Sequence, residues 1–266
     1  MKDYLRATIY EHGNNITLTG YGAKGNSNAT RGVISGFSKK SRQRIMRTMS
    51  TVDQSKIVGT PLFLTLTYPA IWNEDPASWK RDFDTFVKRL SRRYPELVII
   101  WRMEFQKRGA PHFHCLLLNC SPARIYWQHK EMAPFINASW YNAVGSNDPD
   151  HFKAGINLQP VKSFKRLISY VSKYISKEES EQIQSQYPEH IGRFWGIINR
   201  QYMPITPIEV ELTPEEFHRL RRIARNYLEG RIKRDVYIYN TYSGITLYMD
   251  YFNAEKLLYF IKQPIP

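Results

Sequence analysis

Two histidines separated by a single residue, His112 and His114, lie in a run of residues typical of a β-strand. The strand-like run before them carries Arg102, Glu104 and Gln106 on one face, because side chains alternate across a strand. Two imidazoles and a carboxylate form a ligand set for Mn²⁺, Mg²⁺ or Zn²⁺ that leaves positions open for water or phosphate oxygens. These residues therefore predict a catalytic metal site on the polar face of a hairpin.

Residues 107–111 connect the two runs and contain a glycine, which suits a hairpin. With this connection we expect Gln106 to face His112 and Glu104 to face His114. Opposed Cβ atoms lie ~5 Å apart and diagonal ones ~7 to 8 Å, so Glu104, His112 and His114 can all reach one ion. The alternative is that the two histidines are surface or partly buried residues that bind no metal.

Residues 162–177 predict a helix that carries two tyrosines four positions apart, Tyr170 and Tyr174. One side of this helix is an apolar stripe made of Phe164, Leu167, Ile168, Val171 and Ile175. The tyrosines lie at the border of this stripe, beside Lys173 and Lys177. A tyrosine hydroxyl has a pKa of ~10, and nearby positive charge makes it a better nucleophile. Alternatively, both tyrosines pack their rings and form hydrogen bonds without any chemistry.

The elements that position these residues are alternating β-rich and helical runs. We expect strands at residues 62–67, 97–106, 112–119 and 155–161, helices after Asp75, from Thr213 and over residues 254–262, and a hairpin around residues 12–15. This order predicts an α+β fold in which a central antiparallel sheet is flanked by helices and has N- and C-terminal extensions.

The charge of the chain indicates its partner. The 266 residues include 38 Lys and Arg against 24 Asp and Glu, a net charge of +14, and 14% of them are aromatic. Positive charge attracts a polyanion and aromatic rings offer faces on which bases stack, so we expect a nucleic acid. Residues 31–56 are either a phosphate-contacting arm or a solvated helix face. The residues expected to contact DNA are Lys39, Lys40, Arg42, Arg44, Arg102, Arg108, Arg166, Arg221 and Arg222.

Other features exclude whole classes of protein. Two cysteines, Cys115 and Cys120, are too few for a disulfide framework or a cysteine-based zinc site, which fits a reducing cytoplasm. No signal-peptide pattern and no apolar window of the ~18 residues that a membrane helix needs is present, so we expect a cytoplasmic protein of a bacterial or archaeal host cell and no membrane partner. The phosphate-binding loop of nucleotide-driven motors is also missing from the sequence.

Three motifs resemble, in their order, those of the HUH endonucleases, and within them the rolling-circle replication initiators of plasmids and small single-stranded DNA phages. The motifs are Phe63-Leu64-Thr65-Leu66-Thr67, Pro111-His112-Phe113-His114 and Tyr170-Val171-Ser172-Lys173-Tyr174. They fall within about residues 60–200. Relaxases of the same superfamily place the nucleophile before the histidines, so the order here argues against that branch.

The resemblance implies a role for each site residue. His112 and His114 would bind a divalent metal, Mn²⁺ or Mg²⁺, with Glu104 in the place of the family's upstream acidic ligand. Tyr170 and Tyr174 would be the nucleophiles of the two-tyrosine branch, with nearly equal weight and a slight preference for Tyr170.

The implied reaction is site-specific nicking and rejoining of single-stranded DNA at a replication origin through a covalent 5′-phosphotyrosine, with Lys173 and Lys177 as supporting cations. The implied partners are origin DNA with an adjacent hairpin, a separate helicase and the host replication polymerase.

The motifs divide the chain into three parts and leave other functions open. We expect a basic N-terminal extension at residues 1–57, the catalytic domain at 58–203 and a helix-hairpin-helix extension at 204–266. The alternatives are a transposase of the same superfamily with identical chemistry, a noncatalytic protein that binds single-stranded nucleic acid, and a Zn-dependent hydrolase.

Overall fold

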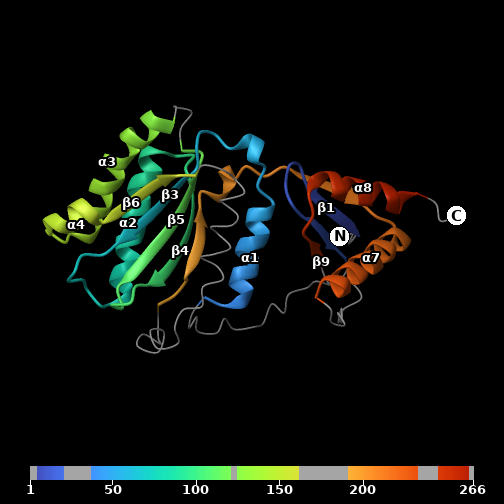
Figure 1. The fold of residues 1–266 in the computed structure, drawn as a ribbon, viewed down its shortest axis with the longest axis horizontal. Coiled ribbons are helices and arrows are strands. Elements are labelled where there is room, and N and C mark those ends of the chain that lie inside the picture. The colour runs from blue at the N-terminus through green and yellow to red at the C-terminus, as the bar shows by residue number, and fades with distance from the viewer. Residues whose placement is uncertain (1–4, 21–36, 121–124, 162–190, 233–244, 264–266) are drawn as a thin grey trace. The chain divides into compact units, whose positions relative to one another are not determined.

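The computed structural model describes residues 5–20, 37–120, 125–161, 191–232 and 245–263 (Figure 1). It contains two antiparallel sheets and several helices, which confirms the expected α+β class. The chain forms two compact units. One unit comprises residues 31–46 and 57–203, and the other comprises residues 1–30, 47–56 and 204–266. We call them the large unit and the small unit.

The large unit is built on a five-stranded antiparallel sheet in the order β6-β3-β5-β4-β7. Its strands are β3 (Leu62–Thr67), β4 (Val98–Phe105), β5 (Pro111–Leu118), β6 (Ile156–Pro160) and β7 (Trp195–Ile198). The four strands expected between residues 62 and 161 are all present. Strand β5, which carries His112 and His114, is the central strand of the sheet and is therefore supported on both edges.

Helices cover the apolar face of this sheet (Figure 1). They are α2 (Pro76–Arg93), α3 (Ile125–Val144) and the short α4 (Pro149–Ala154). Residues alternate between the two faces of β5, so Phe113 points to the helices and stacks on Phe83 of α2, with ring centroids 4.3 Å apart. Trp79, Phe86 and Trp140 are fully buried in the same core. The opposite face of β5 carries the two histidines.

The small unit has a four-stranded antiparallel sheet in the order β8-β1-β2-β9. Its elements are β1 (Arg6–Tyr10), β2 (Ile16–Thr19), β8 (Pro207–Glu211), α7 (Pro214–Ile232), β9 (Ile245–Leu247) and α8 (Tyr251–Lys262). The expected hairpin around residues 12–15 is confirmed. The capping box is confirmed too, because the Thr213 hydroxyl accepts from the Glu216 N–H and the Glu216 carboxylate accepts from the Thr213 N–H.

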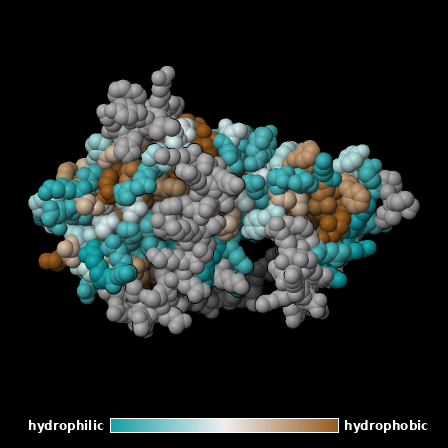
Figure 2. Space-filling view, in the orientation of Figure 1, coloured by the Kyte–Doolittle hydropathy of each residue, from teal (hydrophilic) through white to brown (hydrophobic). Residues whose placement is uncertain are grey.

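Residues from both ends of the sequence share the core of the small unit. Ile16 and Leu18 of β2 pack with Phe217 and Leu220 of α7 and with Leu258 of α8. Segments that the sequence separates into two extensions therefore fold as one unit. On the face shown in Figure 2, hydrophobic residues also reach the surface beside α7 and α8.

The remaining described elements are short or join the two sets of segments. Helix α1 spans Lys39–Ser50, and single 3₁₀ turns lie at Gln54–Lys56 and Arg200–Tyr202. No helix within the described ranges is both long and apolar enough to cross a membrane. The expected helix at 162–177 lies outside the described residues.

Candidate metal centre

The polar face of the five-stranded sheet brings the predicted ligands together. Glu104 of β4 is paired with His112 of β5, and Arg102 is paired with His114. Directly paired residues of an antiparallel sheet point to the same face, so all four side chains lie on the face opposite the helices. Glu104 is 8% exposed and the histidines are half-buried. The expected grouping on one face is confirmed.

The register within this group differs from the expected one. Gln106 does not face His112, because the Gln106 N–H donates to the carbonyl of Ala110 and closes a shorter connection. Gly109 turns this connection with a φ of 82°, a value that glycine adopts without strain. Glu104 is consequently opposite His112 and diagonal to His114. The shift amounts to two residues, and a shift of two keeps every side chain on its face.

Glu104 contacts the more distant histidine directly. Its Oε1 lies 2.6 Å from His114 Nε2, a hydrogen-bond distance in which the imidazole N–H donates to the carboxylate. The rings of His112 and His114 have centroids 4.7 Å apart. Within the described residues, no group of three or more His, Cys, Asp or Glu side chains is already arranged to hold a metal ion. The structure thus shows the carboxylate and one imidazole bonded to each other.

Two threonines lie behind the histidines, and the sequence analysis missed their contacts. Thr65 of β3 is paired with His114, and Thr67 is paired with His112. The Thr65 Oγ1 lies 3.4 Å from His114 Nδ1, and the Thr67 Oγ1 lies 3.3 Å from His112 Nδ1. The signal was available, because alternation along residues 62–67 puts both hydroxyls on one face, but only the strand pairing shows which face they share.

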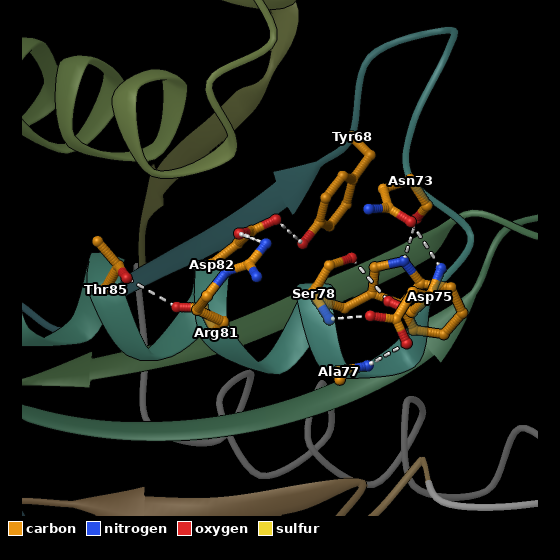
Figure 3. A network of polar contacts seen from close by, with 9 residues as sticks. Tyr68, Asn73, Asp75, Ala77, Ser78, Arg81, Asp82 and Thr85 are labelled. Atoms are coloured by element: carbon orange, nitrogen blue, oxygen red, sulfur yellow. Dashed lines mark hydrogen bonds and ion pairs between the residues drawn. The ribbon is translucent and has the colours of Figure 1, made fainter.

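The end of β3 is held from several sides. The carbonyl of Thr67 accepts hydrogen bonds from Trp140 Nε1 and His151 Nε2, both at 2.9 Å. The Tyr68 hydroxyl, one residue later, donates to Asp82 of α2 at 3.2 Å (Figure 3). Burial raises the pKa of Asp82, and burial followed by the charge of Asp82 raises the pKa of Tyr68. These contacts fix the strand that backs the histidines.

Helix α2 begins where this network begins. Asp75 caps the helix, since its carboxylate accepts from the backbone N–H groups of Ala77 and Ser78 at 3.1 and 3.2 Å (Figure 3). Pro76 is the first helical residue, a position that needs no N–H donor. The cap fixes the start of the helix that covers the back of the sheet, and Asp82 follows two turns later to meet Tyr68.

Two of the predicted DNA-contacting arginines have protein contacts instead. The Arg108 guanidinium donates to the carbonyls of Tyr68, Pro69 and Ala70 and stacks 4.6 Å from the ring of Trp72. It thereby ties the hairpin tip to the loop after β3.

Arg102 is 5% exposed, and its guanidinium lies 4.5 Å from the ring of Phe37. Its Nη2 is 4.0 Å from Glu104 Oε2. This arginine therefore supports the carboxylate of the site from within the protein.

The remaining predicted residues are spread over two helices or lie outside the described part. Lys39 begins α1, Lys40 and Arg44 are exposed on it, and Arg42 is half-buried. Arg221 and Arg222 are half-buried and exposed on α7. The residues outside the described ranges are Arg166, Tyr170, Lys173, Tyr174 and Lys177. For these residues, the predicted roles stay predictions.

The fold and the site define a class of protein: an α+β domain whose central antiparallel strand presents a His-x-His pair beside a buried carboxylate. Residues 61–179 match the family model of the replication-associated proteins of the ORF2 type. This segment belongs to that family, which confirms the resemblance to rolling-circle replication initiators. It runs from β3 through β6 and includes Thr65, Glu104, His112 and His114.

A relative from a phage is similar over a longer stretch. A replication-associated protein of Pseudomonas phage Pf3 is 25% identical over 205 residues, which cover 74% of this chain and 69% of that protein. The similarity therefore extends beyond the 61–179 segment. The assignment to the two-tyrosine branch stays a prediction.

Proposed function

We propose that this protein initiates rolling-circle replication by nicking and rejoining single-stranded origin DNA through a covalent phosphotyrosine. The observation that carries the proposal is the grouping of Glu104, His112 and His114 on one face of the central strands. This group lies inside the segment that matches the replication-associated family. The predicted tyrosines are in the same segment, later in the sequence.

The side chains present fit a divalent metal ion. Two imidazoles and one carboxylate are the donor types that Mn²⁺ accepts, and both Nδ1 atoms already have hydroxyl partners, as outer contacts of ligating histidines do. His112, His114 and Glu104 would hold the ion, and the contact between Glu104 and His114 would give way to it. A bound Mn²⁺ or Mg²⁺ would polarise the scissile phosphate and stabilise the charge on its oxygens.

The tyrosines supply the nucleophile in this proposal. The Oη of Tyr170 or Tyr174 attacks phosphorus as its proton leaves, and the bond from phosphorus to the 3′ oxygen breaks. The 3′ oxygen takes up a proton and becomes a free hydroxyl, while the 5′-phosphate stays bonded to the tyrosine. Lys173 and Lys177 would favour the tyrosinate form. One phosphoester bond replaces another, so the reverse attack by a 3′-hydroxyl rejoins strands without ATP.

The test is a covalent-adduct assay on the full chain. Labelled single-stranded oligonucleotides, tiled across the intergenic DNA of the genetic element that encodes the protein, are incubated with Mn²⁺ and separated on a denaturing gel. We expect one oligonucleotide to give a slower, protease-sensitive band together with a free 3′-hydroxyl fragment. The band should disappear in the Tyr170→Phe, Tyr174→Phe double variant, and the single variants rank the two tyrosines.

Other results select other functions. Cleavage without a covalent band would indicate a hydrolase, and binding without cleavage of any oligonucleotide would indicate a noncatalytic protein. An adduct that persists in the double variant would contradict the choice of nucleophile. Cutting at terminal hairpins of a mobile element rather than at an origin would indicate a transposase. Helicase, polymerase and an origin hairpin enter as partners only if the adduct forms.

A further inference from the structure

The threonines of β3 have contacts that a plain strand residue would not need. β3 and β5 are neighbours in the sheet, and their register places Thr65 beside His114 and Thr67 beside His112. Each hydroxyl meets the Nδ1 atom of its histidine, at 3.4 and 3.3 Å. The arrangement therefore repeats twice along the strand with the same atoms.

These contacts determine which nitrogen of each ring remains for chemistry. The two nitrogens lie on opposite sides of an imidazole, so a ring held at Nδ1 on the β3 side presents Nε2 toward β4. His114 shows this directly, because its Nε2 reaches Glu104 of β4. Glu104 is itself paired with His112. Both Nε2 atoms are thereby oriented toward the side on which the carboxylate lies.

A hydroxyl is well suited to this task. It can donate to a bare Nδ1 or accept from a protonated one, whereas a carbonyl or carboxylate can only accept. While His114 donates its Nε2 proton to Glu104, its Nδ1 is free to accept from the Thr65 hydroxyl. If Nε2 instead binds an ion, Nδ1 carries the proton and the same hydroxyl accepts it. The ring keeps its orientation in both states.

Thr67 is held so that its hydroxyl cannot drift. Its N–H donates to the carbonyl of Gly155 at 2.9 Å, and its carbonyl accepts from Trp140 and His151 at 2.9 Å each. A Cβ on Gly155 would lie 2.6 Å from the His151 carbonyl oxygen and ring, so this close approach requires glycine. Both backbone polar groups of Thr67 are thus fixed by the core.

We infer that Thr65 and Thr67 are positioning residues whose hydroxyls hold Nδ1 of His114 and His112, so that both Nε2 atoms are available to one divalent cation. This inference rests on the proposed function and deepens it. It assigns a role to the strand motif at residues 63–67 that the histidine and tyrosine motifs do not explain.

The experiment uses the full chain and compares valine and serine at the two positions. The Thr65→Val, Thr67→Val double variant keeps the branched shape without the hydroxyls, and the Thr65→Ser, Thr67→Ser double variant restores them. Thr85→Val is the matched control, because the Thr85 hydroxyl donates only to Arg81 within α2. Mn²⁺ affinity is measured by calorimetry, and ¹⁵N spectra of the imidazoles are recorded without metal.

We expect the valine variant to bind Mn²⁺ about 10- to 100-fold more weakly, which is the usual effect of removing such contacts. Its Nδ1 resonances should also shift, while the serine variant and Thr85→Val stay within about twofold of the parent affinity. Tryptophan fluorescence verifies that each variant is folded. A valine variant with parent-like Mn²⁺ affinity and parent-like Nδ1 resonances would overturn the inference.

The outcomes separate this inference from the proposed function. If the parent protein binds Mn²⁺ and the valine variant does not, but no oligonucleotide gives an adduct, then the positioning role stands and the nicking reaction fails. If the parent protein gives an adduct and the valine variant gives it equally at limiting Mn²⁺, nicking stands and the positioning role fails. If the parent binds no Mn²⁺, the metal role of the threonines is refuted even where the resonances shift.

Discussion

The two sheets of the molecule treat their charged residues in opposite ways. In the small unit, Arg6 and Glu209 form an ion pair whose side chains are 45% and 57% exposed. In the large unit, the side chains of Arg102 and Glu104 are 6% and 11% exposed. Water solvates the first pair at little cost, whereas removing the second pair from water costs free energy that the contact itself need not return. Stability alone does not explain the buried charges, and a function at that face does.

The apolar sides of the two sheets are alike. In each, alternate strand residues point to covering helices: Phe113 to α2 in the large unit, and Leu18 to the core shared with α7 and α8 in the small unit. The comparison therefore isolates one difference, the polar face of the large sheet. Each prediction below tests whether that difference is functional.

The largest expected effect comes from the apolar face of the large unit. Phe113 is fully buried against Phe83, so Phe113→Ala should lower the free energy of unfolding by about 3–5 kcal/mol. All six tryptophans lie between residues 72 and 195, within the large unit, so their fluorescence reports its unfolding in urea. The matched variant Leu18→Ala should change the unfolding seen by circular dichroism and leave the fluorescence transition in place. If Leu18→Ala moved the fluorescence transition as far as Phe113→Ala does, the two cores would not be separate.

The second effect contrasts the two acidic residues. Glu104→Ala removes a buried carboxylate that accepts from His114, which should cost about 1.5–3 kcal/mol and abolish the covalent adduct. Glu209→Ala removes an exposed carboxylate and should cost about 0.2–1 kcal/mol with the adduct unchanged. Urea unfolding and the adduct assay measure both quantities. Equal losses of adduct in the two variants would remove the distinction between the sheets.

The sequence predicts the grouping of ligands because that prediction depends only on alternation. A hairpin connection shorter than expected moved the register by two residues, and this changed the partner of Glu104 from His114 to His112 while leaving it on the same face. A shift of one residue would have moved the carboxylate to the core. Turn geometry decides such details, and it depends on Gly109 and on the carbonyl that Gln106 reaches.

Other features depend on contacts between distant residues, which no local pattern reveals. Helix α3 has no clear apolar stripe and contains Pro134, so its sequence does not resemble a surface helix. The joining of both chain ends in one unit follows from the pairing of β1 with β8, about 200 residues apart. Arg108 looked like a solvent-facing cation, but the three carbonyls that it binds come from residues near the end of β3.

The smallest effect concerns pH and again contrasts the two units. His151 of the large unit is 4% exposed, and burial lowers its pKa in the folded protein. The unfolded chain keeps the ordinary histidine pKa near 6.5, so below that pH the unfolded state binds more protons and the free energy of unfolding falls. The described histidines of the small unit, His12 and His218, are exposed. Acidification from pH 7 to pH 5 should therefore destabilise the large unit more through this group.

The variant His151→Gln isolates this contribution, because a glutamine amide can still donate to the Thr67 carbonyl but does not titrate. Its fluorescence-monitored unfolding should depend less on pH between 7 and 5 than that of the parent, with the two curves closest at pH 7. The slope that remains in the variant belongs to other groups of the large unit, including His112 and His114. Identical slopes in the parent and the variant would mean that His151 protonates equally in both states, and that its burial between Ser146 and Thr67 does not disfavour its charge.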